Sequence, residues 1–282
     1  MDQAPGEVLE TRLITLSDLI RIDSLDDSRV DGYRHVADQQ WLVDNAFFVA
    51  EGRLVVRRLI DMQQWPIESI LLTPAAAENL ADVLGATRAP IYIVDQDLMN
   101  GIAGFNIHRG CLALGCRPET ATLDRTTAGP LSRVLVLEGV NNPDNVGGLF
   151  RSAAAFGAEL VVLGPDCGDP LYRKAIRTSM AASLMVPFVH ASQWPGAIRD
   201  LRADGFTVIA LTPNRSVAPI EEVFPHSKLA LLVGSEGGGL TEEAMRTATL
   251  RIRIPTTADV DSLNVTTAAS IAMYHCFAER RS

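Results

Sequence analysis

The second half of the chain alternates short apolar runs with stretches of helical spacing. The apolar runs are VLVLEG (134–139), ELVVLG (159–164), FTVIALT (206–212), LALLVG (229–234) and LRIRIP (250–255). Runs this short and this rich in Val, Ile and Leu predict buried strands of a mostly parallel sheet. The segments VGGLFRSAAAFG (146–157) and TTAASIAMYHCFAERR (266–281) predict helices. This half of the chain therefore predicts a sheet covered by helices on both faces.

The first half predicts a smaller α/β domain. Four apolar runs predict strands: AFFVAEG (46–52), SILLT (69–73), PIYIVD (90–95) and GCLALGC (110–116). An apolar stripe predicts a helix over residues 52–65, and the spacing of Leu13, Ile14, Leu16, Leu19 and Ile20 predicts a leading helix or extension.

The segment ATLDRTTAGPL (121–131) is polar and contains Thr, Gly and Pro, which is typical of a linker. We therefore expect an N-terminal extension and α/β domain over 1–120, a linker over 121–131 and a second domain over 132–282.

The composition indicates a folded protein. The 282 residues are 47% hydrophobic and 21% charged, which is enough apolar material for two domains. No apolar run approaches the roughly 20 residues that span a bilayer, and the first residues lack a signal-peptide pattern. We expect a cytoplasmic protein that does not enter the membrane. None of the four cysteines forms a CxxC pair, so we expect reduced, buried thiols and no metal site.

The charge is acidic overall and unevenly distributed. The net charge is −9, and the first 126 residues carry 19 acidic and 11 basic side chains. This balance argues weakly against a general nucleic-acid coat protein. Only Lys174 and Lys228 are lysines, and arginine is the better bidentate partner for phosphate.

Common nucleotide and hydrolase motifs are absent from the sequence. It contains no GxxxxGK[ST] phosphate loop, no GxGxxG after a strand with a following acid, and no HExxH, GxSxG or kinase signature. Glycine-rich turns that follow strands still favour a ligand site at the carboxyl ends of the strands.

The first remaining motif is LEGVNNPDNVGGLFRSAAAFGA (137–158), a strand, a turn and a helix. We expect the helix to begin near Asn145, whose side chain would cap it. Gly147 and Gly148 permit close approach of another backbone or a ligand. Arg151 could reach back toward the helix start, where exposed amides favour an anion. The motif indicates a phosphate and ribose site or, alternatively, a capped helix with a surface arginine.

Two further motifs follow later in the chain. LALLVGSEGGGL (229–240) leads a strand into a glycine-rich loop in which Glu236 would hold an arginine or a substrate hydroxyl; the alternative is a flexible turn with a solvated Glu. In RIPTTADVDSLNVTTAASIAMYH (253–275), Asp261 or Ser262 would cap the closing helix. Four polar side chains lie at this helix start, which is more than one cap requires: Ser262, Asn264, Thr266 and Thr267. The alternative is that they compete for that single cap.

In this order, NNPDNVGGLFR (141–151), VGSEGGGL (233–240) and IPTTADVDSLNV (254–265) resemble the three motifs of the SpoU (TrmH) family of RNA 2′-O-ribose methyltransferases, of the SPOUT class. DPLYRKAIRTSMAASLMVP (169–187) also resembles the family, except that Ala181 stands where the family usually has glycine. The resemblance covers residues 130–282. It implies a knotted α/β SPOUT methyltransferase domain, preceded by a smaller ribosomal-protein-like α/β domain that binds substrate, in a homodimer.

The resemblance also implies the site. S-adenosylmethionine would be the cofactor, contacted by Gly234, Ile254 and Leu263 and held by loops 234–240, 254–258 and 262–265. In the implied catalytic group, Arg151 would lie at the reacting ribose, clamp the substrate phosphate and stabilise the developing charge. Asn145 would orient the ribose, and Glu236 would fix Arg151 or the 2′-hydroxyl. Ser262 and Asn264 would complete the substrate side. The residues expected to bind RNA are Arg173, Lys174, Arg177, Arg53 and Arg57.

RNA is the implied partner because only RNA carries the 2′-hydroxyl, with rRNA favoured over tRNA. The alternatives are a tRNA 2′-O-methyltransferase, a SPOUT enzyme that methylates a ring nitrogen, and a knotted RNA-binding protein that no longer catalyses.

Overall fold

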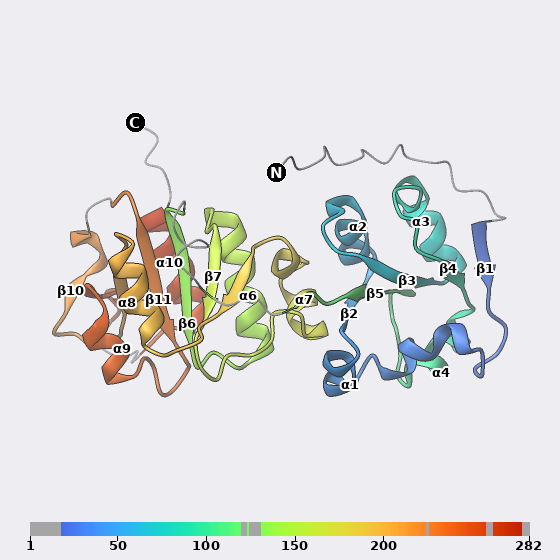
Figure 1. Cartoon of the computed structure of the whole chain (residues 1–282), viewed down its shortest axis with the longest axis horizontal. Helices are drawn as coiled ribbons and strands as arrows, with labels where there is room; N and C mark the ends of the chain where they lie inside the picture. Colours follow the sequence, from blue (N-terminus) through green and yellow to red (C-terminus); the bar gives the residue numbers. More distant parts are fainter. Residues whose placement is uncertain (1–17, 120–122, 124–130, 224–225, 258–261, 278–282) are drawn as a thin grey trace. The chain divides into compact units, whose positions relative to one another are not determined.

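The structure is a computed structural model that describes residues 18–119, 123, 131–223, 226–257 and 262–277. The chain divides into two compact units, residues 1–118 and 119–282 (Figure 1). Most of the expected linker, 121–131, lies outside the described residues. Leu123 and Leu131 are described, and both pack against the core of the second unit.

The described part of the first unit contains a five-stranded mixed sheet of order β1-β4-β3-β5-β2. Its strands are β1 (Leu19–Arg21), β2 (Phe47–Glu51), β3 (Ile67–Leu72), β4 (Ile91–Ile93) and β5 (Cys111–Cys116). The strand β5 runs antiparallel to β2 and β3, and the remaining pairs are parallel. All four strands predicted in this half of the chain are confirmed.

Helices cover both faces of this sheet (Figure 1). On one side lie α2 (Arg53–Met62) and α3 (Pro74–Leu84), and on the other lie η2 (Ser28–His35), α1 (Gln39–Asp44) and α4 (Gln96–Ala103). The leading helix is wrong where it can be tested. Leu19 and Ile20 form β1, because the short apolar run pairs with the edge of β4. Leu13, Ile14 and Leu16 lie outside the described residues.

The second unit is built on a seven-stranded sheet, counted over its described residues, in which every pair is parallel and the order is β10-β12-β9-β11-β6-β7-β8. The strands are β6 (Arg133–Glu138), β7 (Leu160–Leu163), β8 (Phe188–His190), β9 (Thr207–Leu211), β10 (Ala218–Pro219), β11 (Leu229–Gly234) and β12 (Leu250–Arg253). All five predicted strands are present. The pattern missed β8 and β10, which are only three and two residues long.

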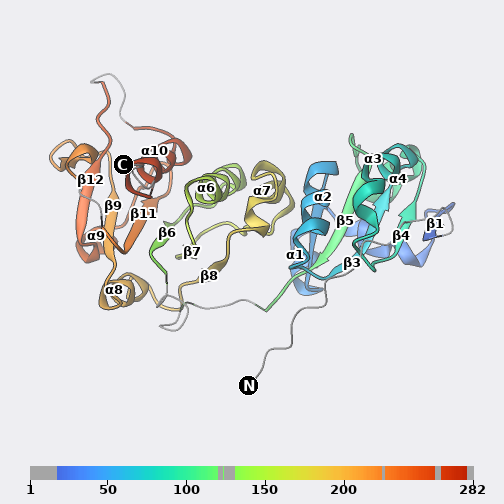
Figure 2. The same ribbon diagram turned by 90° about the horizontal axis from the view of Figure 1, so that it is seen from above.

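Alternate residues of the central strands face two different layers of helices. Leu135 and Leu137 pack toward α6 (Pro143–Phe156) and α10 (Val265–Phe277), whereas Val134 and Val136 pack toward α8 (Gly196–Ala203) and α9 (Glu242–Thr247). Figure 2 shows α6 and α10 on one side of the strands and α8 on the other. Shorter elements complete the unit: α7 (Arg173–Thr178), η3 (Ala182–Leu184) and η4 (Ile220–Glu222). The predicted parallel sheet with helices on both faces is confirmed.

The four cysteines are free thiols, but the expectation that they are buried holds only for Cys111, and the other three are half-buried. Burial raises the pKa of Cys111 to about 12 and that of Cys276 to about 11, so both thiols stay protonated at neutral pH. Among the helices of the described segments, none has the length and apolar character to cross a membrane.

Candidate active site

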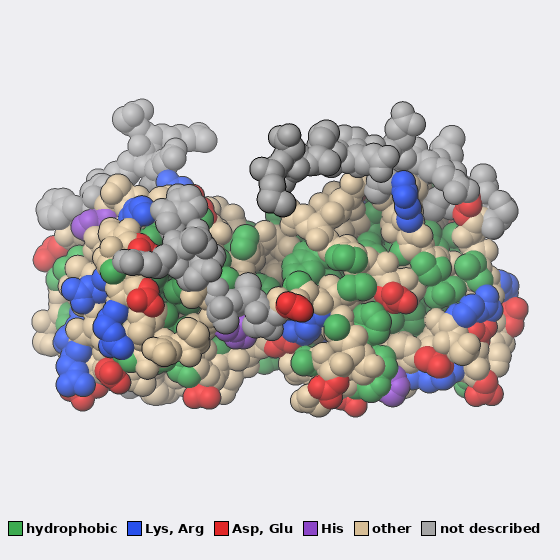
Figure 3. All heavy atoms as spheres, in the orientation of Figure 1, with side chains coloured by type: hydrophobic (Ala, Val, Ile, Leu, Met, Phe, Trp, Pro, Cys, Tyr) green, Lys and Arg blue, Asp and Glu red, His purple; other side chains and the backbone are tan. Residues whose placement is uncertain are grey.

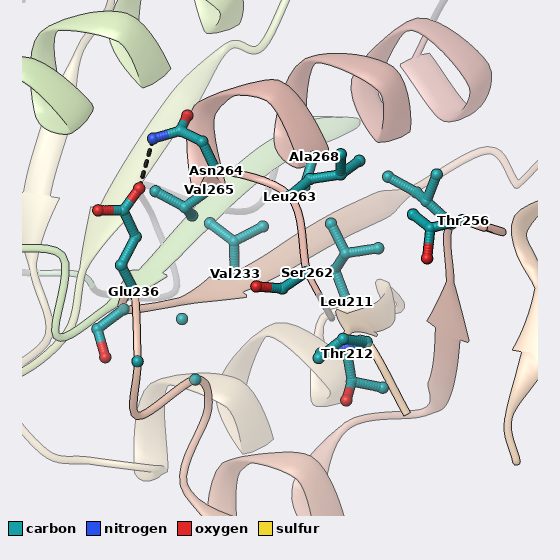
Figure 4. A pocket seen from close by; sticks show the side chains of 16 residues that line it. Leu211, Thr212, Val233, Glu236, Thr256, Ser262, Leu263, Asn264, Val265 and Ala268 are labelled. Atoms are coloured by element: carbon teal, nitrogen blue, oxygen red, sulfur yellow. Dashed lines mark hydrogen bonds between the residues drawn. The ribbon is translucent and has the colours of Figure 1, made fainter. Parts of the chain in front are cut away.

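A pocket of about 470 Å³ opens at the carboxyl ends of β9, β11 and β12, beside the start of α10 (Figure 4). Its lining comes from four segments: Leu211–Pro213, Val233–Gly237 with Gly239, Ile254 with Thr256, and Ser262–Val265 with Ala268. Open parallel sheets bind ligands at this end of their strands, and the volume suits a small organic molecule.

Six residues that the sequence singled out line this pocket: Gly234, Glu236, Ile254, Ser262, Leu263 and Asn264. They come from three segments separated along the chain, and the sheet brings them to one place. Leu211 and Thr212 also line the pocket and were not predicted, whereas Thr256 belongs to the expected loop 254–258. The end of the strand FTVIALT was the only sequence signal for the first two.

The glycine-rich loop 234–240 folds back tightly on its own start. A Cβ atom on Gly234 would lie 2.3 Å from the carbonyl carbon of Gly239 and 2.4 Å from the nitrogen of Leu240. The N–H of Gly239 donates to the carbonyl of Ser235 at 3.0 Å, which closes the turn. Any side chain at position 234 would therefore displace backbone, so the loop requires glycine there.

Asn264 connects three parts of the site. Its Nδ2 donates to Asn145 Oδ1 at 2.9 Å and to Glu236 Oε1, the contact drawn in Figure 4. Its Oδ1 accepts the N–H groups of Thr266 and Thr267 at 3.0 and 3.3 Å.

Asn264 is thus the residue that caps α10. The expected cap at Ser262 is wrong, because the helix begins only at Val265 and its first free amides lie beside Asn264. Asp261, the other expected cap, lies outside the described residues.

The start of α6 also differs from the expectation. The helix begins at Pro143, and Asn142 Oδ1 accepts the N–H of Asp144 at 2.9 Å. Asn145 is therefore not the cap. Proline is favoured at the first helical position, so Pro143 in NNPDN explains why α6 starts before Asn145. Asn145 lies buried in the first turn, which leaves its side chain to accept from Asn264.

The two glycines of α6 allow close packing, as predicted, and the neighbours in this structure are protein segments. A Cβ on Gly147 would lie 2.7 Å from the carbonyl oxygen of Ala175, so the helix packs directly on α7. A Cβ on Gly148 would lie 2.7 Å from Cγ2 of Thr266 in α10. Ser152 and Ser270 add a hydroxyl contact of 2.7 Å between α6 and α10.

Comparison with known proteins identifies this arrangement. The model of the SpoU rRNA Methylase family matches residues 132–274, which include the whole pocket lining. The chain belongs to the SpoU rRNA methylase family. Membership of this family means that the chain is an RNA methyltransferase.

Individual relatives agree with this assignment. The chain is 39% identical to an uncharacterized tRNA/rRNA methyltransferase of Mycobacterium tuberculosis, over 88% of each chain. It is 25% identical to the 23S rRNA (guanosine(2553)-2′-O)-methyltransferase RlmP of Bacillus subtilis, over 90% of this chain and 98% of the relative. An AdoMet-bound rRNA methyltransferase structure from Sinorhizobium meliloti superposes with a TM-score of 0.76 over 92% of this chain and 97% of that one, at 22% identity, and shares the fold.

Arg151 lies on the exposed side of α6, two turns after Asp144 on the same helix face. Within the described residues it makes no contact with Glu236, which bonds to Asn264 instead. Lys174 of α7 pairs with Asp144 at 2.7 Å, and this ammonium holds the pKa of the Asp144 carboxyl below its usual value. Arg173 and Arg177 share the short helix α7 with Lys174. The pair of Lys174 and Asp144 therefore joins α7 to the face of α6 that carries Arg151.

The two arginines of the first unit that are expected to bind RNA have different surroundings. Arg57 donates through both terminal nitrogens to Asp82, at 2.6 and 2.8 Å, and also to the carbonyl of Asn79. It joins α2 to α3, and the contact of Arg57 with RNA stays a prediction. Arg53 is exposed at the start of α2. On the face shown in Figure 3, positive and negative side chains are interspersed over each unit.

One buried polar residue was missed from the sequence. Glu138 ends β6 and is only 3% exposed. The signal was an acid at the end of an otherwise apolar strand, VLVLEG, where a charge is buried only if it is hydrogen-bonded.

Proposed function

We propose that this protein transfers a methyl group from S-adenosylmethionine to a ribose 2′-hydroxyl of ribosomal RNA, the substrate named for its Bacillus relative. The observation that carries the proposal is the pocket itself. It gathers residues of the second and third motifs, and its rim bonds through Asn264 to Asn145 of the first. The Bacillus relative named for 2′-O methylation of 23S rRNA and the AdoMet-bound structure support the same chemistry.

The residues of the pocket suit an adenosyl cofactor. Its lining includes glycine backbone at 234, 237 and 239, which offers amide and carbonyl groups without side chains. Apolar side chains lie beside that backbone and would flank an adenine ring: Leu211, Val233, Ile254, Leu263 and Val265. When bound, S-adenosylmethionine supplies an electrophilic methyl group on a sulfonium centre. We assign Gly234, Ile254 and Leu263 to holding it.

The protein must then make a neutral hydroxyl reactive. The amide nitrogen of Asn264 donates one hydrogen bond to Asn145 and one to Glu236, so Asn264 fixes the position of the Glu236 carboxylate. Within the described residues, Glu236 Oε2 makes no hydrogen bond, and it would accept the 2′-hydroxyl proton. Asn145 and Ser262 would orient the ribose on either side of Asn264.

Arg151 carries a guanidinium group, whose five N–H donors suit a phosphate. On the exposed face of α6 it would clamp the substrate phosphate and stabilise the developing alkoxide. Arg173, Lys174 and Arg177 would follow the RNA backbone from the neighbouring helix. The homodimer and the knot implied by the resemblance remain part of this proposal.

The test compares Arg151→Ala with the unmodified protein. Methyl transfer to RNA should fall at least a hundredfold, because charge stabilisation in the transition state is lost. The affinity for S-adenosylmethionine, measured by calorimetry without RNA, should change less than threefold, because Arg151 does not line the pocket. A collapse of cofactor affinity would contradict this role, and an unmodified protein that binds no cofactor would contradict the function.

A further inference from the structure

The buried carboxylate of Glu138 lies outside the pocket lining but contacts the loop that forms it. Glu138 is the last residue of β6, and it pairs in register with Gly234, the last residue of β11. The glycine-rich loop 234–240 therefore starts directly beside Glu138.

The same side chain reaches the other end of that loop. The N–H of Thr241 donates to Glu138 Oε2 at 2.8 Å, and the Thr241 hydroxyl donates to Oε1 at 2.8 Å. Thr241 Oγ1 also accepts the N–H of Ala244 at 3.2 Å, so it caps α9. Glu138 thus joins the loop exit to the strand beside the loop entrance.

A third donor completes the carboxylate. Trp194 donates its indole N–H to Oε1, and its ring packs over Gly164, where a Cβ would lie 3.0 Å from Cζ3. A buried carboxylate that accepts three hydrogen bonds is a strong and directional anchor. Removing one acceptor would leave a buried N–H without a partner, which proteins avoid.

We propose that Glu138 is a positioning residue that holds loop 234–240 in the conformation that binds the cofactor. This inference rests on the proposed function, because it assumes that the pocket takes S-adenosylmethionine. Glu138 acts through Thr241 and the loop backbone and does not itself line the pocket.

The experiment measures S-adenosylmethionine affinity by calorimetry, at a temperature well below unfolding, for the whole chain and for Glu138→Gln. The amide has nearly the same shape, but its NH₂ group meets a donor, so one anchor to Thr241 or Trp194 is lost. We expect the Kd to rise at least tenfold and amide hydrogen exchange to accelerate across residues 235–240. A residue that only stabilises the fold would lower the unfolding temperature and leave the Kd unchanged.

A matched pair at Thr241 keeps the test decisive if Glu138→Gln does not fold. Thr241→Ser retains both donors and should bind with near-normal Kd, whereas Thr241→Val loses the hydroxyl and should bind at least fivefold more weakly. Equal Kd values across the unmodified protein and the variants would overturn the inference. An unmodified protein that fails to bind S-adenosylmethionine would instead overturn the proposed function, so the two failures are distinguishable.

Discussion

Asn264 uses every hydrogen-bonding position of its amide. The two N–H groups reach Asn145 and Glu236, and the oxygen accepts from Thr266 and Thr267. One side chain therefore both starts α10 and fixes the carboxylate at the rim of the pocket. The substitution Asn264→Asp separates these two roles, because aspartate keeps the oxygen that accepts hydrogen bonds and loses the N–H groups that donate them.

Asn264→Asp should leave the unfolding free energy within about 1 kcal/mol of the unmodified protein, because Asp and Asn cap helices equally well. Methyl transfer should fall by about two orders of magnitude, because the new carboxylate repels Glu236. Asn264→Ala should lose transfer and, in addition, about 1 kcal/mol of stability with the cap. Thermal unfolding and initial rates on RNA measure both effects. Normal turnover in Asn264→Asp would contradict the assigned role.

Ala181 is a second residue whose position has a measurable consequence. It is fully buried with a φ of +69°, in the left-handed region that disfavours side chains. Replacing it by glycine relieves about 1–2 kcal/mol of backbone strain. The same change loses methyl burial and adds chain entropy, each costing about 0.5–1 kcal/mol.

The net effect of Ala181→Gly on the unfolding free energy should therefore lie near zero. Ala182→Gly, at the adjacent buried residue of η3, has no left-handed strain to relieve and should cost about 1.5 kcal/mol. Chemical denaturation of the two variants tests this difference. Equal losses at both positions would show that Ala181 is unstrained.

At this scale the sequence predicted which residues gather but not how they bond. Gly234, Glu236, Ile254, Ser262, Leu263 and Asn264 line one pocket as the motifs indicated. The bond from Glu236 to Asn264, in place of one to Arg151, depends on side-chain geometry that spacing does not contain.

The helices α6, α7 and α10 pack more closely than side chains would usually allow. Gly147 brings α6 against the backbone of α7, and Gly148 brings it against Thr266 of α10. These contacts place Asn145, at the start of α6, beside Asn264, at the start of α10. Small residues at the helix interface thus determine where the polar groups of the site meet.

Gly147→Ala should destabilise the protein by about 1–3 kcal/mol, because its methyl meets backbone atoms that have little room to move. Gly148→Ala meets only the side chain of Thr266, so adding Thr266→Ala should recover most of its loss. Denaturation midpoints for the single and double variants check this pair. Failure of Thr266→Ala to rescue Gly148→Ala would contradict the packing described for α6 and α10.

Elements with a strong apolar pattern were predicted well, and those set by tertiary contacts were not. Four of the five predicted strands of the second unit, β6, β7, β9 and β11, have buried residues on both faces of the sheet. In contrast, β1 takes its conformation from pairing with β4, and Ser262 is excluded as a cap only because α10 starts at Val265. Pro143 in the sequence indicates an earlier start of α6 than the predicted cap at Asn145.

Binding to phosphate depends on the surroundings of each basic side chain. The net charge is −9, yet local placement rather than net charge governs binding to phosphate. Arg57 is engaged by Asp82 inside the first unit. Arg151 lies on α6 and Arg173, Lys174 and Arg177 lie on the neighbouring helix α7, where Lys174 pairs with Asp144 of α6.

Replacing Arg173 and Arg177 together by glutamine should weaken RNA binding at all sequences and reduce the slope of log affinity against log salt by about 1.4, as expected for two lost phosphate contacts on single-stranded RNA. Arg57→Gln is the matched control and should leave both quantities unchanged. Filter binding over a range of salt concentrations measures them. An unchanged slope in the double variant would remove α7 from the RNA-binding surface.

The division into two units and the α/β architecture of each were predictable from the apolar pattern, since each unit contains its own sheet and core. The acidic balance of the first unit gave no guide to function, because net charge does not show which basic side chains are paired, as Arg57 is with Asp82. The activity class followed from the three motifs and from the family match over residues 132–274.

The most direct measurement is transfer of labelled methyl groups from S-adenosylmethionine to total RNA of cells that lack this protein, followed by nucleoside analysis. We predict a single labelled nucleoside methylated at the ribose 2′-oxygen, and no transfer when the target nucleotide is 2′-deoxy. A label on a base would contradict the assignment of Asn145, Arg151 and Glu236 to the ribose. Absence of both transfer and cofactor binding would contradict the enzyme itself.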